Sequence, residues 1–421
     1  MTDVQPFRAL RYDPGRVRLE EVLAPVYDVV APEERALYWD RHPYNALRLE
    51  LTRAVDEEAE TDYREVGERL ARWRREGVLA FDREPALYVL RQRYEAPGGG
   101  VHERIGFYGA LRLEDYERRV VRPHERTLAG PKRDRLKILR ATRTNLSSVL
   151  LLYEDRDRKL EGLLEPALAS AETLSARDDA GVLHSLAPLR EPAAVAALQG
   201  FLAHRPVVIA DGHHRYETAL AYREERRAQQ GQQPGSGFER LLACFVNAFA
   251  PGSLLLPIHR LVVRGPVPTD PAWAQLAGWE QRQVRVAGAE AVPAALAEHL
   301  APLADCHAFA ADAGDGCLRI FSRPAGEELS VRVIHREVLA GLLGLDEEAV
   351  RQGAVAFPKS ALQTARDVRS GRGSLALYLN PLRPDDVFRV TEAGETLPQK
   401  STFFYPKLPT GLLFRALEDA P

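Results

Sequence analysis

Several features that mark large classes of protein are missing from this sequence or rare in it. Its 421 residues include three cysteines, and no two of them form a CxxC pair. They give no disulfide framework, which fits a reducing compartment. No apolar run approaches the roughly 20 residues of a membrane-spanning helix, and the first residues, MTDVQPFRALRYDP, lack the apolar core of a secretory signal. We therefore expect a cytoplasmic location and no membrane partner.

A strong charge of one sign is also missing. Lysine and arginine number 57 and aspartate and glutamate 60, which leaves a formal net charge of −3. No basic stripe or helix-turn-helix pattern stands out, so we do not expect DNA as a partner. Hydrophobic residues make up 45% and charged residues 28%, an ordinary balance for globular proteins. Nothing in these numbers indicates an oligomeric state.

The order of predicted elements indicates a mixed α/β fold of two units. Strands are expected at 87–95, 104–114 and 148–153, and helices at 56–76 and 134–140. Residues 154–200 are typical of a helical connector. The segment QQGQQPGSGF at 229–238 is typical of a flexible linker. We therefore expect one unit over residues 1–235 and a second α/β unit over 236–421, in which residues 329–334 form a strand.

The most informative stretch runs from residue 206 to residue 227, PVVIADGHHRYETALAYREERR. Its apolar start predicts a short buried strand, and the later spacing of apolar residues predicts a helix. The polar turn between them would then lie at a helix N-terminus, where free N–H groups and the helix dipole attract anions. The candidate phosphate-binding residues of this turn are Asp211, Gly212, His213, His214 and Arg215. The pattern is neither a P-loop nor a Rossmann fingerprint.

Two other interpretations of this turn stay open. Asp-Gly before a helix is a common turn and helix cap. The two histidines could instead bind a metal ion, although adjacent side chains diverge on a helix or a strand and the HExxH spacing is absent.

Further polar residues could complete a site for an anionic ligand. The segment RPHERTLAGPKRDR after residue 121 offers His124, Glu125, Arg126, Lys132 and Arg135, and it is either a second wall of the site or a solvated loop. Asp28 is a carboxylate within an apolar run. It is either a turn or cap residue, or a functional residue that acts as a base or as a magnesium ligand. In the tail, Lys400 and Lys407 are either surface residues or cations that close the site.

Six segments resemble one known family along nearly the whole chain. They are PFRALRYDP, APVYDVVAPEE, HPYNALRLE, PHERTLAGPKRDRL, ADGHHRYETAL and LPQKSTFFYPKLPTGLL. They are similar to the bacterial and archaeal domain of unknown function 1015 family. One departure is Val26, which stands where the family usually has a second proline before Tyr-Asp.

The Gly-His-His-Arg stretch also resembles the phosphate-binding turn of the ParB/sulfiredoxin-like superfamily, which includes chromosome-partition CTPases and free-serine kinases. This resemblance implies a ParB-like nucleotide-binding unit in residues 1–235, with phosphate held by Gly212, His213, His214 and Arg215. Sulfiredoxin chemistry is disfavoured because His213 occupies the position of its cysteine.

The function that we expect is a nucleotide-dependent kinase acting on a small hydroxylated metabolite, with free serine favoured by resemblance. The nucleotide is ATP, ADP or CTP. Asp211 and Asp28 are the expected Mg²⁺ ligands, and Glu125, then His124, the expected bases. Arg126, Lys132, Arg135 and Lys400 would neutralise phosphate charge. A nucleotide-binding regulator with slow or no turnover and a phosphohydrolase are the alternatives.

Overall fold

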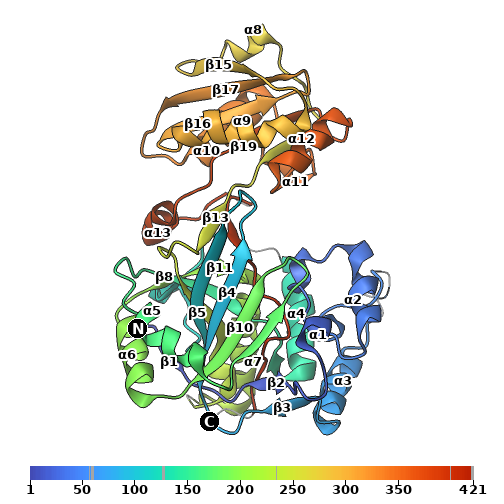
Figure 1. Ribbon diagram of the computed structural model, residues 1–421, viewed down its shortest axis with the longest axis vertical. Coiled ribbons are helices and arrows are strands. Elements are labelled where there is room, and N and C mark those ends of the chain that lie inside the picture. Colours follow the sequence, from blue (N-terminus) through green and yellow to red (C-terminus); the bar gives the residue numbers. More distant parts are fainter. Residues whose placement is uncertain (56, 58–60, 126–128, 234, 399, 419–421) are drawn as a thin grey trace. The chain divides into compact units, whose positions relative to one another are not determined.

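The computed structural model describes residues 1–55, 57, 61–125, 129–233, 235–398 and 400–418. It divides the chain into two compact units, shown in Figure 1. Unit 1 comprises Met1–Leu254, Thr391–Thr396 and Pro406–Pro421, and unit 2 comprises Leu255–Val390 and Leu397–Tyr405. Both units combine helices with sheets, so the chain has the mixed α/β fold that the sequence predicts. In the described part of the chain, no helix is both long enough and apolar enough to cross a membrane.

The centre of unit 1 is a nine-stranded sheet. Its strands follow the order β6-β11-β8-β12-β5-β4-β10-β9, and β1 pairs with β5. The β6–β11 and β8–β12 pairs are parallel, and the other pairs are antiparallel. The strands span Val4–Gln5 (β1), Leu87–Glu95 (β4), Val101–Arg112 (β5), Val121–Arg122 (β6), Val149–Tyr153 (β8), Leu174–Arg177 (β9), Leu183–Leu189 (β10), Val207–Asp211 (β11) and Arg240–Asn247 (β12).

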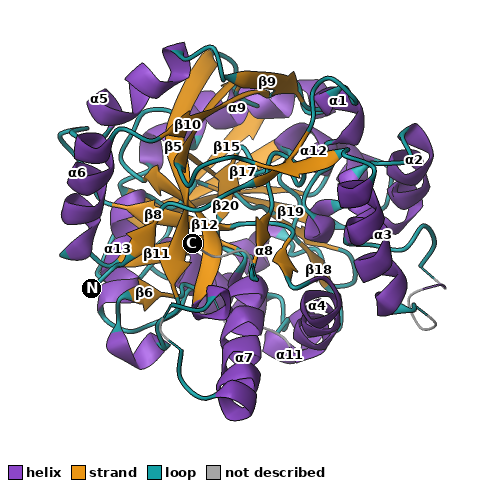
Figure 2. Ribbon diagram, turned by 90° about the horizontal axis from the view of Figure 1, so that it is seen from below, coloured by secondary structure: helices purple, strands orange, loops and turns teal. Residues whose placement is uncertain are grey.

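Helices cover this sheet and bury its apolar side chains. Figure 1 shows α5 and α6 at one side of unit 1 and the blue helices α1, α2 and α3 at the other. Helix α4 packs between α3 and α7, and Figure 2 shows α4 beside α7. The helices span Leu19–Val22 (α1), Arg35–Arg41 (α2), Tyr63–Arg75 (α3), Ala129–Thr142 (α4), Glu161–Leu164 (α5), Pro192–Ala203 (α6) and His213–Gln230 (α7). Two small ribbons complete the unit, β2 (Leu10–Tyr12) with β3 (Leu79–Phe81), and β7 (Thr144–Asn145) with β21 (Arg415–Ala416).

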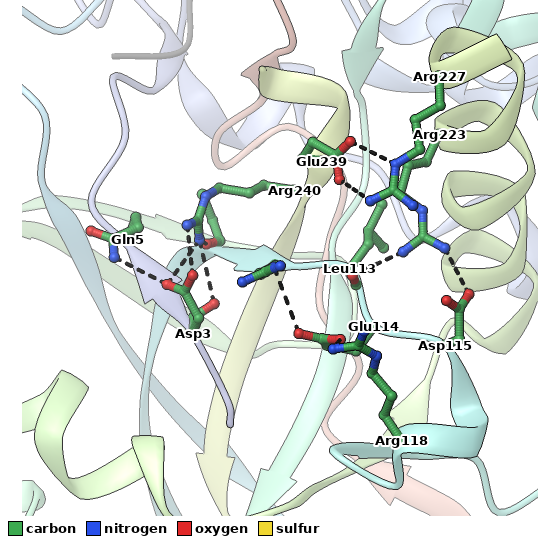
Figure 3. A network of polar contacts seen from close by, with 12 residues as sticks. Asp3, Gln5, Leu113, Glu114, Asp115, Arg118, Arg223, Arg227, Glu239 and Arg240 are labelled. Carbon is green, nitrogen blue, oxygen red and sulfur yellow. Dashed lines mark hydrogen bonds and ion pairs between the residues drawn. The ribbon is translucent and has the colours of Figure 1, made fainter. Parts of the chain in front are cut away.

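Two arginines attach the second half of α7 to the sheet, as Figure 3 shows. Arg223 donates to the Leu113 carbonyl at 2.9 Å and to the Asp115 carboxylate at 2.6 Å. Arg227 donates through two nitrogens to Glu239, at 2.7 and 2.6 Å. Arg223 is buried, and charge-assisted bonds of this kind are strong and directional. They hold α7 in a fixed position on the sheet, and so they also place its first turn.

The structure does not place the first boundary between the units at residue 235, where the sequence predicts it. Helix α7 continues to Gln230, and the segment after it leads directly into β12. Because β12 lies in the middle of the unit 1 sheet, unit 1 continues to Leu254. The Gln/Gly-rich segment is therefore a connection within unit 1, and its composition reflects a loop rather than a link between units.

The prediction of a helical connector at 154–200 was wrong in part. Helices α5 and α6 lie there, but so do β9 and β10. Strand β10 pairs along its whole length with β4, more than eighty residues earlier in the chain, Leu189 lying opposite Leu87. The local pattern could not show this strand because its partner is distant in sequence.

Unit 2 is built on a six-stranded sheet of order β15-β17-β16-β19-β14-β18. Its strands are Glu280–Arg285 (β15), Cys317–Pro324 (β17), Cys306–Asp312 (β16), Leu375–Leu379 (β19), Arg260–Val262 (β14) and Val355–Ala356 (β18). Its helices are Asp270–Trp273 (α8), Val292–His299 (α9), Ser330–Ile334 (α10), Glu347–Arg351 (α11) and Ala361–Arg369 (α12). A ribbon of β13 (Leu254–Leu256) with β20 (Phe403–Tyr405), and α13 (Pro384–Glu392), occur where the chain passes between the units.

The strand predicted at 329–334 is instead helix α10, which continues into a π-helix at His335–Leu342. The buried residues Val331, Ile334 and Val338 follow each other at helical spacing. Their β-branched side chains favour strands locally. Burial of one helical face outweighs that preference here.

Candidate functional site

The turn between β11 and α7 has the geometry of an anion-binding site. Strand β11 ends at Asp211 and α7 begins at His213. Gly212 between them has φ 92°, a left-handed conformation that favours glycine. A Cβ atom on Gly212 would lie 2.9 Å from Nε of Arg215, so the glycine also makes room for the guanidinium. Gly212 has no side chain to cap the helix. The first N–H groups of α7 have no helical carbonyl four residues before them, so they can donate to a ligand.

Two cations converge on the carboxylate of Asp211. Arg215 donates to its Oδ2 and Lys407 to its Oδ1, each at 2.5 Å. Burial alone would raise the pKa of Asp211, but Lys407 and Arg215 outweigh it and lower that pKa, so the carboxylate is ionised. Burial alone would lower the pKa of Arg215, but the carboxylates of Asp211 and Asp28 outweigh it and raise that pKa.

The guanidinium of Arg215 also retains an unused donor. Its Nη1 donates to the carbonyl of Ser148, just before β8, and its Nη2 is engaged by Asp211. Its Nε is buried and has no hydrogen-bond partner among the described residues. Buried donors are normally paired. This one lies directly beside the Gly212 turn, where it could donate to a ligand.

The parallel pairing of β6 with β11 brings His124 and Glu125 to the same turn. The backbone N–H of His124 donates to Nε2 of His213 at 3.3 Å, although the two residues are 89 positions apart. Nδ1 of His124 lies 2.5 Å from the Ile209 carbonyl, so we assign the proton to that nitrogen. Nε2 of His124 lies 3.7 Å from Oε1 of Glu125. The structure therefore brings together two of the segments in which the sequence places site residues.

The two histidines of the turn are neutral. Burial, with a smaller contribution from the neighbouring His124, lowers the pKa of His213 to about 3. Burial also lowers the pKa of His214. Because Nε2 of His213 accepts a hydrogen bond, its Nδ1 carries the proton and can donate. At neutral pH the positive charge of the site thus comes from Arg215 and Lys407.

Lys132 and Arg135 of α4 also lie near α7. Lys132 donates to Oε2 of Glu217 at 2.6 Å, one turn into α7. Arg135 stacks on the ring of Tyr27, with its guanidinium carbon 4.1 Å from the ring centre, and that of Arg215 lies 6.0 Å from the same ring. The ring of Tyr27 is therefore close to a guanidinium of α4 and to one of α7.

Tyr27 and its neighbour Asp28 place a third segment at the site. Burial raises the pKa of Tyr27 to about 12, so the phenol is neutral. The charge of Asp28 acts on the pKa values of Arg215 and His214, which places that carboxylate close to the first turn of α7. Asp28 thus lies at the site, where the sequence left open a turn, a base or a metal ligand.

The sequence of the site occurs within a recognised family. The family model described as "Protein of unknown function (DUF1015)" matches residues 4–278. The chain belongs to the DUF1015 family. The matched region contains Asp28, Glu125 and the Gly212–Arg215 turn, but it ends before the tail that carries Lys407. No curated protein matches the chain.

Several solved structures overlap partly with this DUF1015 protein. A free serine kinase mutant in complex with ADP has 13% identity and a TM-score of 0.37, and the overlap covers 74% of this chain and 92% of that one. A conserved hypothetical protein from Pyrococcus furiosus has 13% identity and a TM-score of 0.33, covering 75% and 97%. Truncated SbnI from Staphylococcus aureus has 11% identity and a TM-score of 0.35, covering 72% and 85%.

The remaining predicted residues have different outcomes. Arg126 lies outside the described residues. Lys400 belongs to unit 2, whereas the Gly212 turn belongs to unit 1, so its role stays a prediction. The tail lysine that contacts Asp211 is Lys407. The aromatic tail contains both lysines, and nothing in the local sequence distinguishes the one that contacts the turn.

Among the described residues, no group of three or more His, Cys, Asp or Glu side chains could hold a metal ion. This argues against the metal-binding interpretation of the paired histidines. Mg²⁺ sites in phosphoryl-transfer enzymes need only one or two carboxylates, because substrate phosphates and water supply the other oxygens. Asp211, both oxygens of which already accept from Arg215 and Lys407, and Asp28 therefore stay predicted Mg²⁺ ligands.

Proposed function

We propose that unit 1 binds a nucleotide at the Gly212 turn and transfers a phosphoryl group to a hydroxyl of a small metabolite. The observation that carries this proposal is the gathering of Arg215, Lys407 and the first N–H groups of α7 around one glycine turn, with Glu125 close by. Free serine is the favoured acceptor through the resemblance to serine kinases. The cytoplasm is the proposed compartment.

The turn supplies what a transferring phosphate needs. Phosphoryl transfer depends mostly on positioning and on neutralising charge over the phosphate oxygens. The N–H groups of α7 and Nε of Arg215 would donate to those oxygens. Lys407 and Arg215, which are paired with Asp211, would share their charge with the nucleotide.

Mg²⁺ is part of the proposal, and Asp211 and Asp28 would hold it. When bound, it would neutralise charge on the nucleotide phosphates. The carboxylate of Asp211 is kept ionised by Lys407 and Arg215, and the metal ion would replace one of these two partners. Lys132 and Arg135 would add positive charge from α4, although each already contacts a carboxylate, Glu217 and Asp134 respectively.

In the proposed step, the acceptor oxygen attacks the terminal phosphorus of the nucleotide. The bond from that phosphorus to the bridging oxygen breaks, and the nucleotide leaves with one phosphate fewer. The proton of the acceptor hydroxyl passes to Glu125, the first candidate base, and His124, whose Nε2 lies 3.7 Å from Oε1 of Glu125, is the second candidate. The product is a phosphate monoester.

A screen of the purified full chain tests this proposal. The chain is incubated with Mg²⁺, one of ATP, ADP or CTP, and serine or another small hydroxylated compound. We expect a phosphorylated acceptor to appear in proportion to the nucleotide consumed. Phosphate release without an acceptor would indicate a phosphohydrolase, and binding without turnover a regulator. Absence of nucleotide binding would overturn the proposal.

Lys407→Ala should weaken nucleotide binding by about 1.5–3 kcal/mol, the range for a hydrogen bond to a charged group. Lys407 is the more exposed of the two cations on Asp211, so its loss should leave unit 1 folded. Calorimetric titration measures the affinity. Lys159→Ala is the control, since Lys159 is an exposed surface lysine paired with Asp157, and Lys400→Ala tests the other tail lysine. Equal affinity of Lys407→Ala and the unaltered chain would remove Lys407 from the site.

A further inference from the structure

Unit 1 contains a cavity of about 310 Å³ formed by α3, α4 and the segment before α3. This volume is at the lower end of the roughly 300–1,000 Å³ of small-molecule sites. The described residues that line it include five carboxylates and three guanidiniums. Hydroxyls of Thr52, Thr61 and Tyr63 line it as well. The cavity has the size and polarity for a small polar metabolite.

Two residues of the cavity wall also belong to the surroundings of the Gly212 turn. Glu50 and Arg135 line the cavity. The guanidinium of Arg135 stacks on Tyr27, which lies next to Arg215. The charge of Glu50 acts on the pKa of Arg215. A molecule in the cavity would therefore lie beside the proposed phosphate site.

The guanidiniums of the wall are already engaged within the protein. Arg48 donates to the Trp39 carbonyl at 3.0 Å, and Arg69 to the Arg48 carbonyl at 2.6 Å. Arg135 donates to the Asp134 carboxylate and to the carbonyl of Glu50. These contacts reduce the capacity of the three arginines to bind a second anion.

The carboxylate of Glu50 is different. The residue is only 4% exposed, and no salt bridge to it occurs among the described residues. Its contacts are the hydroxyl of Thr410 at 3.4 Å and that of Ser147. Burial raises the pKa of Glu50, against the opposing charges of Arg135 and Arg215. A buried carboxylate without a directly bonded cation is costly, and a cation bound in the cavity would relieve that cost.

We propose that this cavity is the acceptor site and that it selects a small hydroxyl-bearing amine, whose ammonium group pairs with Glu50. The excess of carboxylates over guanidiniums on the wall favours a cation over an anion. The part of this inference that makes the occupant an acceptor rests on the proposed function. The selection of an ammonium group does not.

Three matched ligands test the selection without any nucleotide. They are 2-aminoethanol, ethylene glycol and glycolate, which share a hydroxymethyl group and differ in carrying a positive, no or a negative charge. NMR titration of the full chain at millimolar concentrations should show binding of 2-aminoethanol at least roughly ten-fold tighter than of the other two. No binding of 2-aminoethanol, or equal binding of glycolate, would overturn the inference.

Glu50→Gln should weaken binding of 2-aminoethanol roughly ten- to hundred-fold, because it removes the charge that pairs with the ammonium group. Glu50→Asp retains the charge and should bind more tightly than Glu50→Gln. The matched control is Glu161→Gln, since Glu161 is also buried, at 7% exposure, but pairs with Arg158 and begins α5, on the other side of unit 1 from α3. It should leave the affinity unchanged. Thermal melts of all three variants identify loss of folding.

Nucleotide affinity and phosphoryl transfer are measured on the same samples. If Glu50→Gln bound 2-aminoethanol as tightly as the unaltered chain, while phosphoryl transfer to some other acceptor was intact, only the cavity inference would be overturned. Glu50-dependent binding of 2-aminoethanol with no nucleotide binding would overturn the proposed function and the acceptor role, and would support the ammonium site.

Discussion

Glu125→Gln is expected to lower turnover by roughly 10²–10⁴-fold, the usual contribution of a general base. Glutamine has nearly the same shape as glutamate but cannot take the proton of the acceptor hydroxyl. The side chain of Glu125 is partly exposed, at 25%, and its Oε1 lies 3.7 Å from Nε2 of His124. The substitution therefore removes neither a core contact nor a cation of the phosphate site. Folding and nucleotide affinity should remain unchanged.

Steady-state kinetics with the acceptor found in the screen measure this effect. A lower kcat with an unchanged nucleotide KM indicates loss of the base. Glu224→Gln is the control, because Glu224 is an exposed partner of Arg223 and Arg227 on α7. If Glu125→Gln turned over at the normal rate, Glu125 would not be the base and its contact with His124 would be structural only.

The elements next to the Gly212 turn are predictable from sequence because their signals are local. The apolar run at 206–210 predicts β11, which the structure places at Val207–Asp211. The positive φ of Gly212 and the start of α7 follow from the same few residues. Short buried strands and helix starts depend on neighbours along the chain, so they are visible in a single sequence.

The assembly of the site depends on distant pairings that no local pattern contains. His124 reaches His213 because β6 pairs in parallel with β11, Val121 lying opposite Val207. The sequence suggested that the two segments meet only through the tendency of polar turns to gather at one end of a sheet. Lys407 reaches Asp211 across 196 positions.

Glu50 shows a second limit of sequence reasoning. The segment HPYNALRLE resembles its family counterpart. Its last residue, Glu50, nevertheless has the local pattern of an ordinary charged residue after a short apolar run. The importance of Glu50 comes from burial close to Arg135 and Arg215, which lie in other parts of the chain. A buried carboxylate of this kind is recognised only when the charges around it are known.

Arg215→Ala is expected to destabilise unit 1 by about 3–5 kcal/mol, the cost of breaking a buried ion pair on one side. Arg215 is 9% exposed and connects Asp211 to the carbonyl of Ser148. Without it, the ionised Asp211 keeps only Lys407, and the Ser148 carbonyl loses its donor. Denaturant unfolding measures the loss, and Arg215→Lys, which retains the charge but not the forked geometry, should lose less.

The same substitution tests the phosphate site, provided that binding is measured where the variant is folded. Arg215→Ala should weaken nucleotide binding by about 1.5–3 kcal/mol. Adding Asp211→Asn to Arg215→Ala separates the two effects. The double variant removes the uncompensated carboxylate and should regain part of the stability, but it cannot regain Nε of Arg215 as a phosphate donor. Recovery of both stability and nucleotide affinity in the double variant would show that Arg215 serves Asp211 alone and that the nucleotide binds elsewhere.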